Sequence, residues 1–384
     1  MDSTILSDAV ATQDTVTQLI SAIRRVGRQV PGVAEQIERV CTGHDYTRAG
    51  KPRIDWEDPE AKDALVSALV NDANAVVAAL SGADLDDDPD AEFALALLAL
   101  VAGQDVEPAE GSEGTDGRWR IAGRVAPDRV VSTVDPDARH TRKSPENRRD
   151  GYRAHVAAEP ETGIITDEQL TKAAGTQNSD PAVAEKFLDR EDEVCEWYGD
   201  SAYGTGDLRG AIDAAVDDAD HDAVIKPRPL KPPVEGGTVD DFTVDEPTGT
   251  VTCPAGNTRP ITPARAVIFG KLCHDCPLRA RCTTSKSGRT LQLHDRDDLL
   301  RHARRDWADK PDLREKYRKF RPNVERVISQ IASRGSRRLK LRYRGTTKNH
   351  AWLTRRTAAL NLRTLLGPGL TRTAGVWVLA PQTT

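Results

Sequence analysis

Two acidic residues have surroundings in which a carboxylate could do chemistry. Asp200 follows a short apolar and aromatic run in EWYGDSAYG, which predicts a buried strand that ends at this aspartate. In an open α/β sheet the ligand crevice lies at the carboxyl ends of the strands, so Asp200 is a candidate site residue; a plain turn is the alternative. Glu325 lies beside an apolar helical stripe, one turn after Arg321. In this basic segment a carboxylate can hold a divalent metal while cations hold phosphates; a solvated surface glutamate is the alternative.

Four of the six cysteines have the spacing of a metal site. Cys253, Cys273, Cys276 and Cys282 form the pattern C-x19-C-x2-C-x5-C. Four thiolates suit a tetrahedral structural Zn²⁺, and in a segment with few apolar residues zinc would supply folding energy. Four unrelated thiols in a loop are the alternative, and His274 is a weaker substitute ligand. The other two, Cys41 and Cys195, are predicted to be small buried residues.

The charge is distributed unevenly along the chain. The formal net charge is −6, yet residues 301–363 hold 20 Lys and Arg against 5 Asp and Glu. Such an asymmetry favours a polyanionic partner, with a solvated helix face as the alternative. The basic residues that follow the Glu325 helix alternate with Leu339, Leu341 and Tyr343. We expect them, together with Arg321, to contact DNA phosphates: Arg337, Arg338, Lys340, Arg342 and Arg344.

The elements that must position these residues can be read from periodicity and turn signals. Helices are predicted over 5–26, 58–81 and 90–102, followed by an acidic linker over 103–117. Strands are predicted in RWRIAGRVA and RVVSTVD, a hairpin over 151–170 and a helix over 181–191. The strand that ends at Asp200, a helix over 205–218 and a strand over 222–227 form a βαβ unit. Residues 311–366 are predicted to be helical, with Pro322 at a helix start.

The sequence resembles the catalytic region of bacterial insertion-sequence transposases of the DDE class, whose core is ribonuclease H-like. The resembling segments keep their order over nearly the whole chain: MDSTILSDAVATQDTVTQLISAIRRV, STVDPDARHTRKS, DGYRAHVAAEPETGIIT, YGDSAYG, CPAG with CHDCPLRARC, and YRKFRPNVERVISQIASRG.

The resemblance implies three carboxylates that hold two Mg²⁺ (or Mn²⁺) ions across a phosphodiester. Asp200 matches the second acid, because a small residue and an aromatic follow it. Glu325 matches the third, four residues after Arg321. Asp2, in DST, matches the first, while Asp135 is a rival that ends a predicted strand or stands behind the metal ligands.

Only Met1 precedes Asp2, so the strand expected to carry the first acid and the family's N-terminal helical region are absent from this sequence. We therefore expect either a misassigned start or a truncated chain with little transposition activity.

The expected function is cleavage and strand transfer at the ends of an insertion sequence, by a homodimer on double-stranded DNA. An inactive fragment that binds DNA or pairs with full-length enzyme as an inhibitor is the alternative, and a zinc-dependent nucleic-acid-binding protein of another lineage is a third reading. The chain has no signal peptide and no run of about 18 apolar residues. We expect no membrane association and a cytoplasmic, nucleoid-associated protein.

The predicted fold class is α/β: a ribonuclease H-like mixed sheet with a helical insertion and a cysteine-rich one. We divide the chain into a helical segment (1–117), core strands and helices (118–227), the cysteine-rich insertion (228–300), and the Glu325 helix with a basic DNA-binding segment (301–384).

Overall fold

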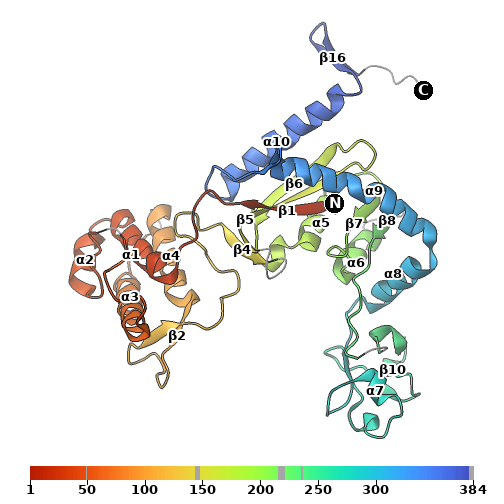
Figure 1. Cartoon of the computed structure of the whole chain (residues 1–384), viewed down its shortest axis with the longest axis horizontal. Coiled ribbons are helices and arrows are strands. Elements are labelled where there is room, and N and C mark those ends of the chain that lie inside the picture. Colours follow the sequence, from red (N-terminus) through yellow and green to blue (C-terminus); the bar gives the residue numbers. More distant parts are fainter. Residues whose placement is uncertain (49, 86, 143–147, 215–220, 235–236, 380–384) are drawn as a thin grey trace.

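The computed structural model describes residues 1–48, 50–85, 87–142, 148–214, 221–234 and 237–379, and all structural statements concern these residues. The described chain is a mixed α/β structure with several small sheets. Figure 1 shows a helical unit at one end, a sheet crossed by a long helix in the middle, and a smaller cysteine-bearing segment at the other end. Each of these parts has a hydrophobic core.

The sheet in the middle is built around one long strand. β5 (Arg148–Ala158) pairs antiparallel with β1 (Asp2–Ser7), β4 (Arg139–Arg142) and β6 (Ile165–Lys172). The register sets Asp2 opposite Val156 and Ser7 opposite Gly151. Gly151 has a φ of +153°, and a Cβ at this position would lie 2.0 Å from the carbonyl oxygen of Leu6. The close approach of β1 to β5 therefore requires glycine there.

A parallel strand pair adjoins this sheet. β7 (Glu196–Gly199) pairs with β8 (Asp222–Ile225), and α6 (Gly206–Ala214) follows β7. The amino group of Met1 donates a 2.6 Å hydrogen bond to the carbonyl oxygen of Tyr198, so β1 begins beside β7. The predicted βαβ unit and hairpin are confirmed. The end of the predicted 205–218 helix lies outside the described residues.

The helical unit contains α1 (Thr15–Gln29), α2 (Val33–Val40), α3 (Pro59–Ala79) and α4 (Pro89–Gln104). The side chains of Asp14, Asp58 and Asp88 accept hydrogen bonds from backbone amides at the starts of α1, α3 and α4. The apolar faces of the helices meet in one core that also receives Trp119 from the hairpin β2 (Val106–Pro108) and β3 (Trp119–Ile121).

Several sequence predictions are wrong at the N-terminal half. The helix predicted over 5–26 is a strand and a later helix, because Asp14 caps α1 and the residues before it pair with β5. Asp2 therefore belongs to a strand, contrary to the expectation that its strand is missing. The acidic linker is partly the hairpin β2–β3, so the boundary drawn at residue 117 falls inside that hairpin. RVVSTVD forms only one isolated bridge, between Val130 and Arg139.

The cysteine-bearing segment, which we define as residues 237–293, follows β8. It holds β9 (Thr243–Asp245), β10 (Thr250–Thr252), β11 (Thr258–Pro260), β12 (Ala266–Ile268) and β13 (Thr290–Gln292) in two small sheets, with short helices at Val239–Asp241, Gly270–Cys273 and Arg279–Cys282. Its core is small, and Phe242, Val251 and Phe269 are at its centre.

The C-terminal part is mostly helical. α8 (Asp297–Asp309) leads into α9 (Pro311–Ala332), then the short pair β14 (Ser333–Arg334) and β15 (Arg337–Arg338), α10 (Thr346–Leu366) and the hairpin β16 (Leu370–Thr373) with β17 (Val376–Leu379). The helix α5 (Asp180–Leu188) and a turn of helix at Thr176–Asn178 complete the described elements. Pro322 lies inside α9 rather than at its start, so that prediction is wrong.

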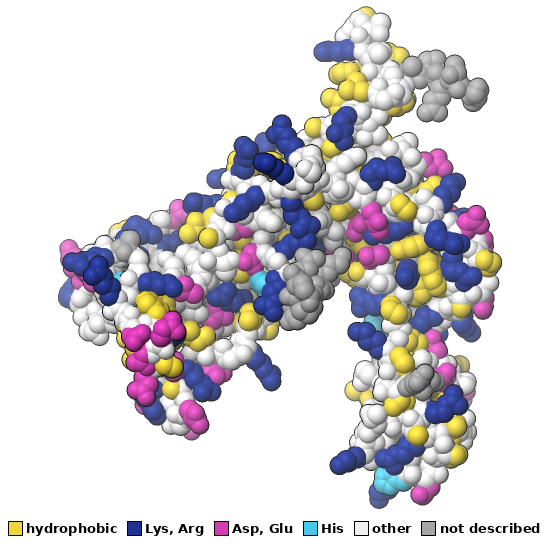
Figure 2. Space-filling view, viewed as in Figure 1, with side chains coloured by type: hydrophobic (Ala, Val, Ile, Leu, Met, Phe, Trp, Pro, Cys, Tyr) yellow, Lys and Arg dark blue, Asp and Glu magenta, His cyan; other side chains and the backbone are white. Residues whose placement is uncertain are grey.

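α9 is the helix that crosses the sheet in Figure 1. Val324, Val327 and Ile331 pack from α9 into the core that contains Leu6 and Tyr152 of the sheet. This packing fixes which residues of α9 face the start of β1. Figure 2 shows acidic side chains gathered over the part of the helical unit around α3 and β2, and Lys and Arg side chains over much of the remaining surface in this view.

Candidate active site

Asp200 is held in the tight turn that follows β7. Its backbone carbonyl accepts a hydrogen bond from the amide of Tyr203 at 3.1 Å, and its carboxylate accepts one from the amide of Ala202 at 2.7 Å. Tyr203 is buried, and its ring atoms would lie 3.1–3.2 Å from a Cβ at Gly199. The small residues of GDSAYG thus let the turn fold back over the tyrosine while the Asp200 carboxylate stays accessible.

Asp2 enters the same region from the sheet. It is the first residue of β1, and its carboxylate accepts a 2.7 Å hydrogen bond from the amide of Ser3. Burial raises the pKa of Asp2, while the guanidinium of Arg321 and the hydrogen bond from Ser3 oppose that rise. A cation beside this carboxylate therefore offsets the cost of burying its charge.

Arg321 brings the three predicted acids together. Its guanidinium lies 3.0 Å from Asp2, 3.7 Å from Asp200 and 3.7 Å from Glu325, measured between the nearest nitrogen and oxygen atoms. The Arg321 side chain is only 6% exposed, whereas that of Glu325 is 63% exposed. Burial lowers the pKa of Arg321, but the carboxylates more than offset this, so the net shift is upward. The residue is a cation at every physiological pH.

These residues line one cleft of about 620 Å³. Asp2, Asp200 and Glu325 are separated by more than 100 residues along the chain, and β1, the turn after β7, and α9 deliver them to this cleft. Four arginines also line it: Arg149, Arg153, Arg321 and Arg338. Carboxylates for metal binding and cations for phosphate binding therefore share one cavity.

A fourth acid of the cleft, Asp180, was missed by the sequence analysis. It is the first residue of α5, and it lies 3.1 Å from Arg153 of β5 and 3.5 Å from His155. Burial lowers the pKa of His155 to about 4, so the arginine is the charged partner of Asp180. An aspartate before proline at the start of a helix looks like an ordinary first turn, and nothing in the sequence pattern signals its position in the cleft.

Asp135 is not among the residues that line the cleft. It is 1% exposed, and it accepts hydrogen bonds from the hydroxyl of Tyr152 at 2.6 Å and from the amide of Gly345 at 3.1 Å. Burial and the neighbouring Asp135 carboxylate raise the pKa of Asp8 to about 7. Asp135 thus ties the sheet to the segment before α10, and its position does not favour it as the first acid.

The predicted phosphate-binding residues lie in several places, and Arg321 is already paired with the three acids of the cleft. Arg338 lines the cleft, and Lys340 forms a parallel bridge with Ser7 at the end of β1. Arg344 lines a different cavity, at the helical unit. Arg337 and Arg342 are exposed to solvent. The segment that carries these cations therefore leads away from the cleft along the end of β1.

The four predicted zinc ligands line one small cavity of about 30 Å³. Cys253, Cys273 and Cys282 also pack against the core of the cysteine-bearing segment. Burial raises the pKa of the Cys282 thiol; the guanidinium of Arg289 opposes that rise, and the other three cysteines add to it. Cys41 is buried, as predicted, and Cys195 is half-buried.

The described side chains do not form a ready-made metal site. Across the part of the chain that the structure describes, no three His, Cys, Asp or Glu side chains are already arranged around a point that could hold an ion. In the cleft, the positively charged group that lies among the carboxylates of the three predicted acids is the Arg321 guanidinium. The donor set nevertheless fits Mg²⁺ in kind, because that ion prefers a few hard carboxylate oxygens and keeps several waters.

Comparisons with known proteins bear on the C-terminal half. No curated protein and no solved structure matches the chain. None of the helices within the described ranges is long and apolar enough to cross a membrane. Residues 252–366 match a family model described as a transposase DDE domain, a segment that includes Arg321 and Glu325, and this match supports a DDE transposase.

Proposed function

We propose that this chain is the catalytic part of a DDE transposase with a ribonuclease H-like core, which cleaves DNA and transfers strands at the ends of a bacterial insertion sequence. One observation carries the proposal: Asp2, Asp200 and Glu325 come from distant parts of the chain, line one cleft and contact one guanidinium. The family match at residues 252–366 supports it independently.

In this proposal Asp2, Asp200 and Glu325 hold divalent metal ions, Mg²⁺ or Mn²⁺. When bound, such ions act as Lewis acids on the oxygens of a phosphodiester. Arg149, Arg153 and Arg338 are the cations of the cleft that can bind the flanking phosphates. Arg321 lies within ion-pair distance of all three carboxylates and offsets their negative charge in a partly buried site.

The test is nicking of a duplex that carries the terminal repeats of the element, with Mg²⁺ or Mn²⁺. Replacing Asp2, Asp200 or Glu325 with Ala is expected to lower the rate on the order of 10²-fold or more, as for removal of a group that stabilises transition-state charge. Asp213→Asn, at an exposed aspartate on α6, is the matched control and should cleave normally. Normal cleavage by Asp200→Ala would refute the proposal.

We further propose that the enzyme acts as a homodimer on DNA, since an insertion sequence has two ends and each requires a cleft. Mass determination of the complex with a repeat-end duplex tests this. A complex with the mass of two chains and two duplexes is expected, and a complex with the mass of one chain and one duplex at saturation would contradict the proposal.

We also propose a structural zinc in the cysteine-bearing segment. The lining of one cavity by Cys253, Cys273, Cys276 and Cys282 supports this, as does the small core around it. The purified protein should then contain about one zinc per chain by elemental analysis, and Cys276→Ser should lose it while Cys195→Ser retains it. Equal zinc content in both variants would contradict the proposal.

A further inference from the structure

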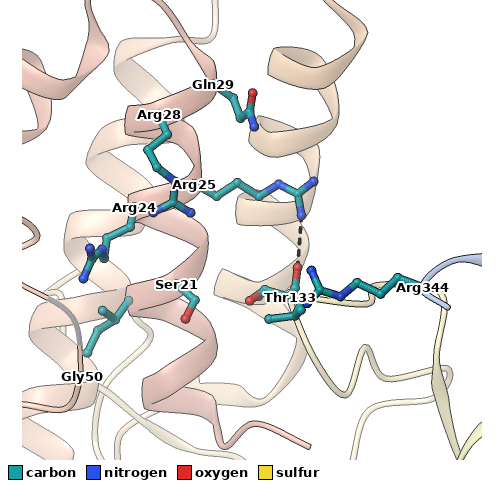
Figure 3. A pocket seen from close by; sticks show the side chains of 10 residues that line it. Ser21, Arg24, Arg25, Arg28, Gln29, Gly50, Thr133 and Arg344 are labelled. Carbon is teal, nitrogen blue, oxygen red and sulfur yellow. Dashed lines mark hydrogen bonds between the residues drawn. The ribbon is translucent and has the colours of Figure 1, made fainter. Parts of the chain in front are cut away.

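A second cavity lies where the helical unit meets the C-terminal segment. Its volume is about 510 Å³, and four arginines line it: Arg24, Arg25 and Arg28 from α1, and Arg344 from the segment before α10. We call these four residues the arginine pocket. Figure 3 shows Arg24 and Arg344 on opposite sides of the cavity, with Thr133 beside Arg344.

The arginine pocket holds positive charge that no acidic side chain of the described residues neutralises. Within these residues no carboxylate lines the cavity, and none of the four arginines forms an ion pair. Arg25 is held by a 3.1 Å hydrogen bond to the carbonyl of Thr133 and by the ring of Phe93, 5.2 Å away. Like charges gathered in this way repel one another, so the arrangement favours a bound anion.

Several arginines elsewhere in the helical unit do have acidic partners. The chain has 60 Asp and Glu against 54 Lys and Arg. Arg48 lies 3.1 Å from Asp45, Arg118 lies 2.7 Å from Asp116, and Arg120 lies 3.0 Å from Glu107. Arg39 and Arg53 of the unit also form no ion pair within the described residues, so what distinguishes this pocket is that four unpaired arginines line one cavity.

A basic segment connects the arginine pocket with the acidic cleft. Arg338 lines the cleft and Arg344 lines the pocket. Between them the amide of Leu341 donates a 2.9 Å hydrogen bond to the carbonyl of Ser7, which fixes the segment along the end of β1. Six extended residues span at most about 20 Å. This length corresponds to about six phosphates along one DNA strand.

We propose that the arginine pocket binds the phosphate backbone of a DNA duplex whose neighbouring phosphodiester lies in the acidic cleft. The inference rests on the proposed function and adds a second contact, made by the helical unit rather than by the cleft. Guanidinium groups suit this task because they bind phosphate oxygens in pairs. Such contacts position the duplex without reading its sequence.

The test is DNA binding by the full chain in EDTA, measured by fluorescence anisotropy with a duplex of about 30 base pairs over a salt series. The variant R24Q/R28Q/R344Q removes three cations. Each phosphate contact contributes about −0.9 to the slope of log K against log salt concentration, so the slope should become less steep by about 2.7. At 0.1 M salt this corresponds to an affinity loss on the order of 10²-fold or more.

The matched control is R48Q/R118Q/R120Q, which removes the same charge from ion-paired arginines of the same unit. This variant should change the slope of log K against log salt concentration by less than about 0.9, the contribution of one phosphate contact. Equal effects of the two triple variants would overturn the inference, although wild-type binding would leave the proposed function standing. If the wild-type chain does not bind duplex DNA at all, the proposed function fails and the inference fails with it.

A measurement on the wild-type chain covers the case in which the triple variant does not fold. Arginine modification by a phenylglyoxal reagent, located by mass spectrometry, should be slowed by DNA at Arg24, Arg28 and Arg344 but not at Arg48. Protection at Arg338 without protection at Arg24 and Arg28 would place the duplex elsewhere and overturn the inference. Protection by an acidic polypeptide but not by DNA would assign the pocket to a protein partner and overturn it as well.

Discussion

Arg321 has two opposing effects on the cleft. It offsets the charge of three carboxylates, and it is itself buried, with Nε and Nη1 lacking hydrogen-bond partners within the described structure. Removing one partner of a buried ion pair leaves an uncompensated charge, which is usually more costly than the pair is stabilising. The balance in this cleft should therefore depend on whether divalent cations are present.

Arg321→Gln is expected to lower the free energy of unfolding by about 1–3 kcal/mol in EDTA, less than for a fully buried pair because Asp200 and Glu325 are partly exposed. Mg²⁺ should recover part of the loss, since it neutralises the same carboxylates. Thermal and urea unfolding with and without Mg²⁺ measure both effects.

Arg326→Gln, at an exposed position of the same helix, is the control and should leave stability unchanged. A loss for Arg321→Gln that Mg²⁺ deepens would contradict the explanation.

Asp8 should make stability fall as pH rises. Its pKa in the folded protein is about 7 against an ordinary value of 3.8, so the folded chain retains a proton that the unfolded chain releases. The free energy of unfolding therefore decreases between about pH 4 and pH 7 through this group. Asp8→Asn resembles the protonated acid and should raise the melting temperature at pH 8 by roughly 2 °C or more, with no gain at pH 4.

Differential scanning fluorimetry at the two pH values makes this comparison, and Asp213→Asn serves as the reference because that aspartate is exposed. A gain at pH 4 as large as that at pH 8 would show that proton retention by Asp8 is not the cause.

At the scale of the elements, the pairing of β1 with β5 positions Asp2. Gly151→Ala would force a methyl group to within about 2 Å of the Leu6 carbonyl oxygen, so β1 would have to move. We expect a destabilisation of about 2–4 kcal/mol by chemical denaturation, together with loss of cleavage. Gly123→Ala is the control, since a Cβ at Gly123 has no neighbour within 4 Å. A stable, active Gly151→Ala protein would show that β1 tolerates displacement.

The sequence predicted those elements whose signals are local. An Asp-Pro start marked α3, and an Asp-Ala start marked the helix predicted over 90–102, although the cap of α4 is Asp88. β-branched and aromatic runs bounded by turn residues marked β5, β6 and β7. β1 was missed because DSTILS is mostly polar, and its apolar residues fit the helical period of the segment after it. It becomes a strand through pairing with β5, whose residues lie about 150 positions later.

The candidate site could be predicted only where a residue has a local setting. Asp200 follows a strand and Glu325 lies one turn from Arg321, so both were identified from sequence and both line the cleft. Asp180 and Arg153 were missed because their partnership depends on how α5 packs beside β5. Asp135 follows an apolar run, as a site acid would, yet tertiary packing buries it against Tyr152.

At the scale of the whole molecule, separate hydrophobic cores predict that the parts unfold separately. The core of the helical unit includes Leu69 and Leu98, whereas Val156 belongs to the core under α9. Leu98→Ala should cost about 2–4 kcal/mol and raise amide hydrogen exchange within α1–α4. Val156→Ala is the matched variant and should raise amide hydrogen exchange in the sheet rather than in α1–α4. Uniform acceleration by either variant would show that the chain unfolds as one unit.

The single guanidinium shared by three acids has a consequence for how occupancy of the cleft could be sensed. Because Arg321 is paired with acids on the first strand, in the turn after β7 and on its own helix, any ligand that draws one carboxylate away changes the electrostatic environment of the other two. Three segments that are distant in the sequence would then respond together when a ligand enters the cleft.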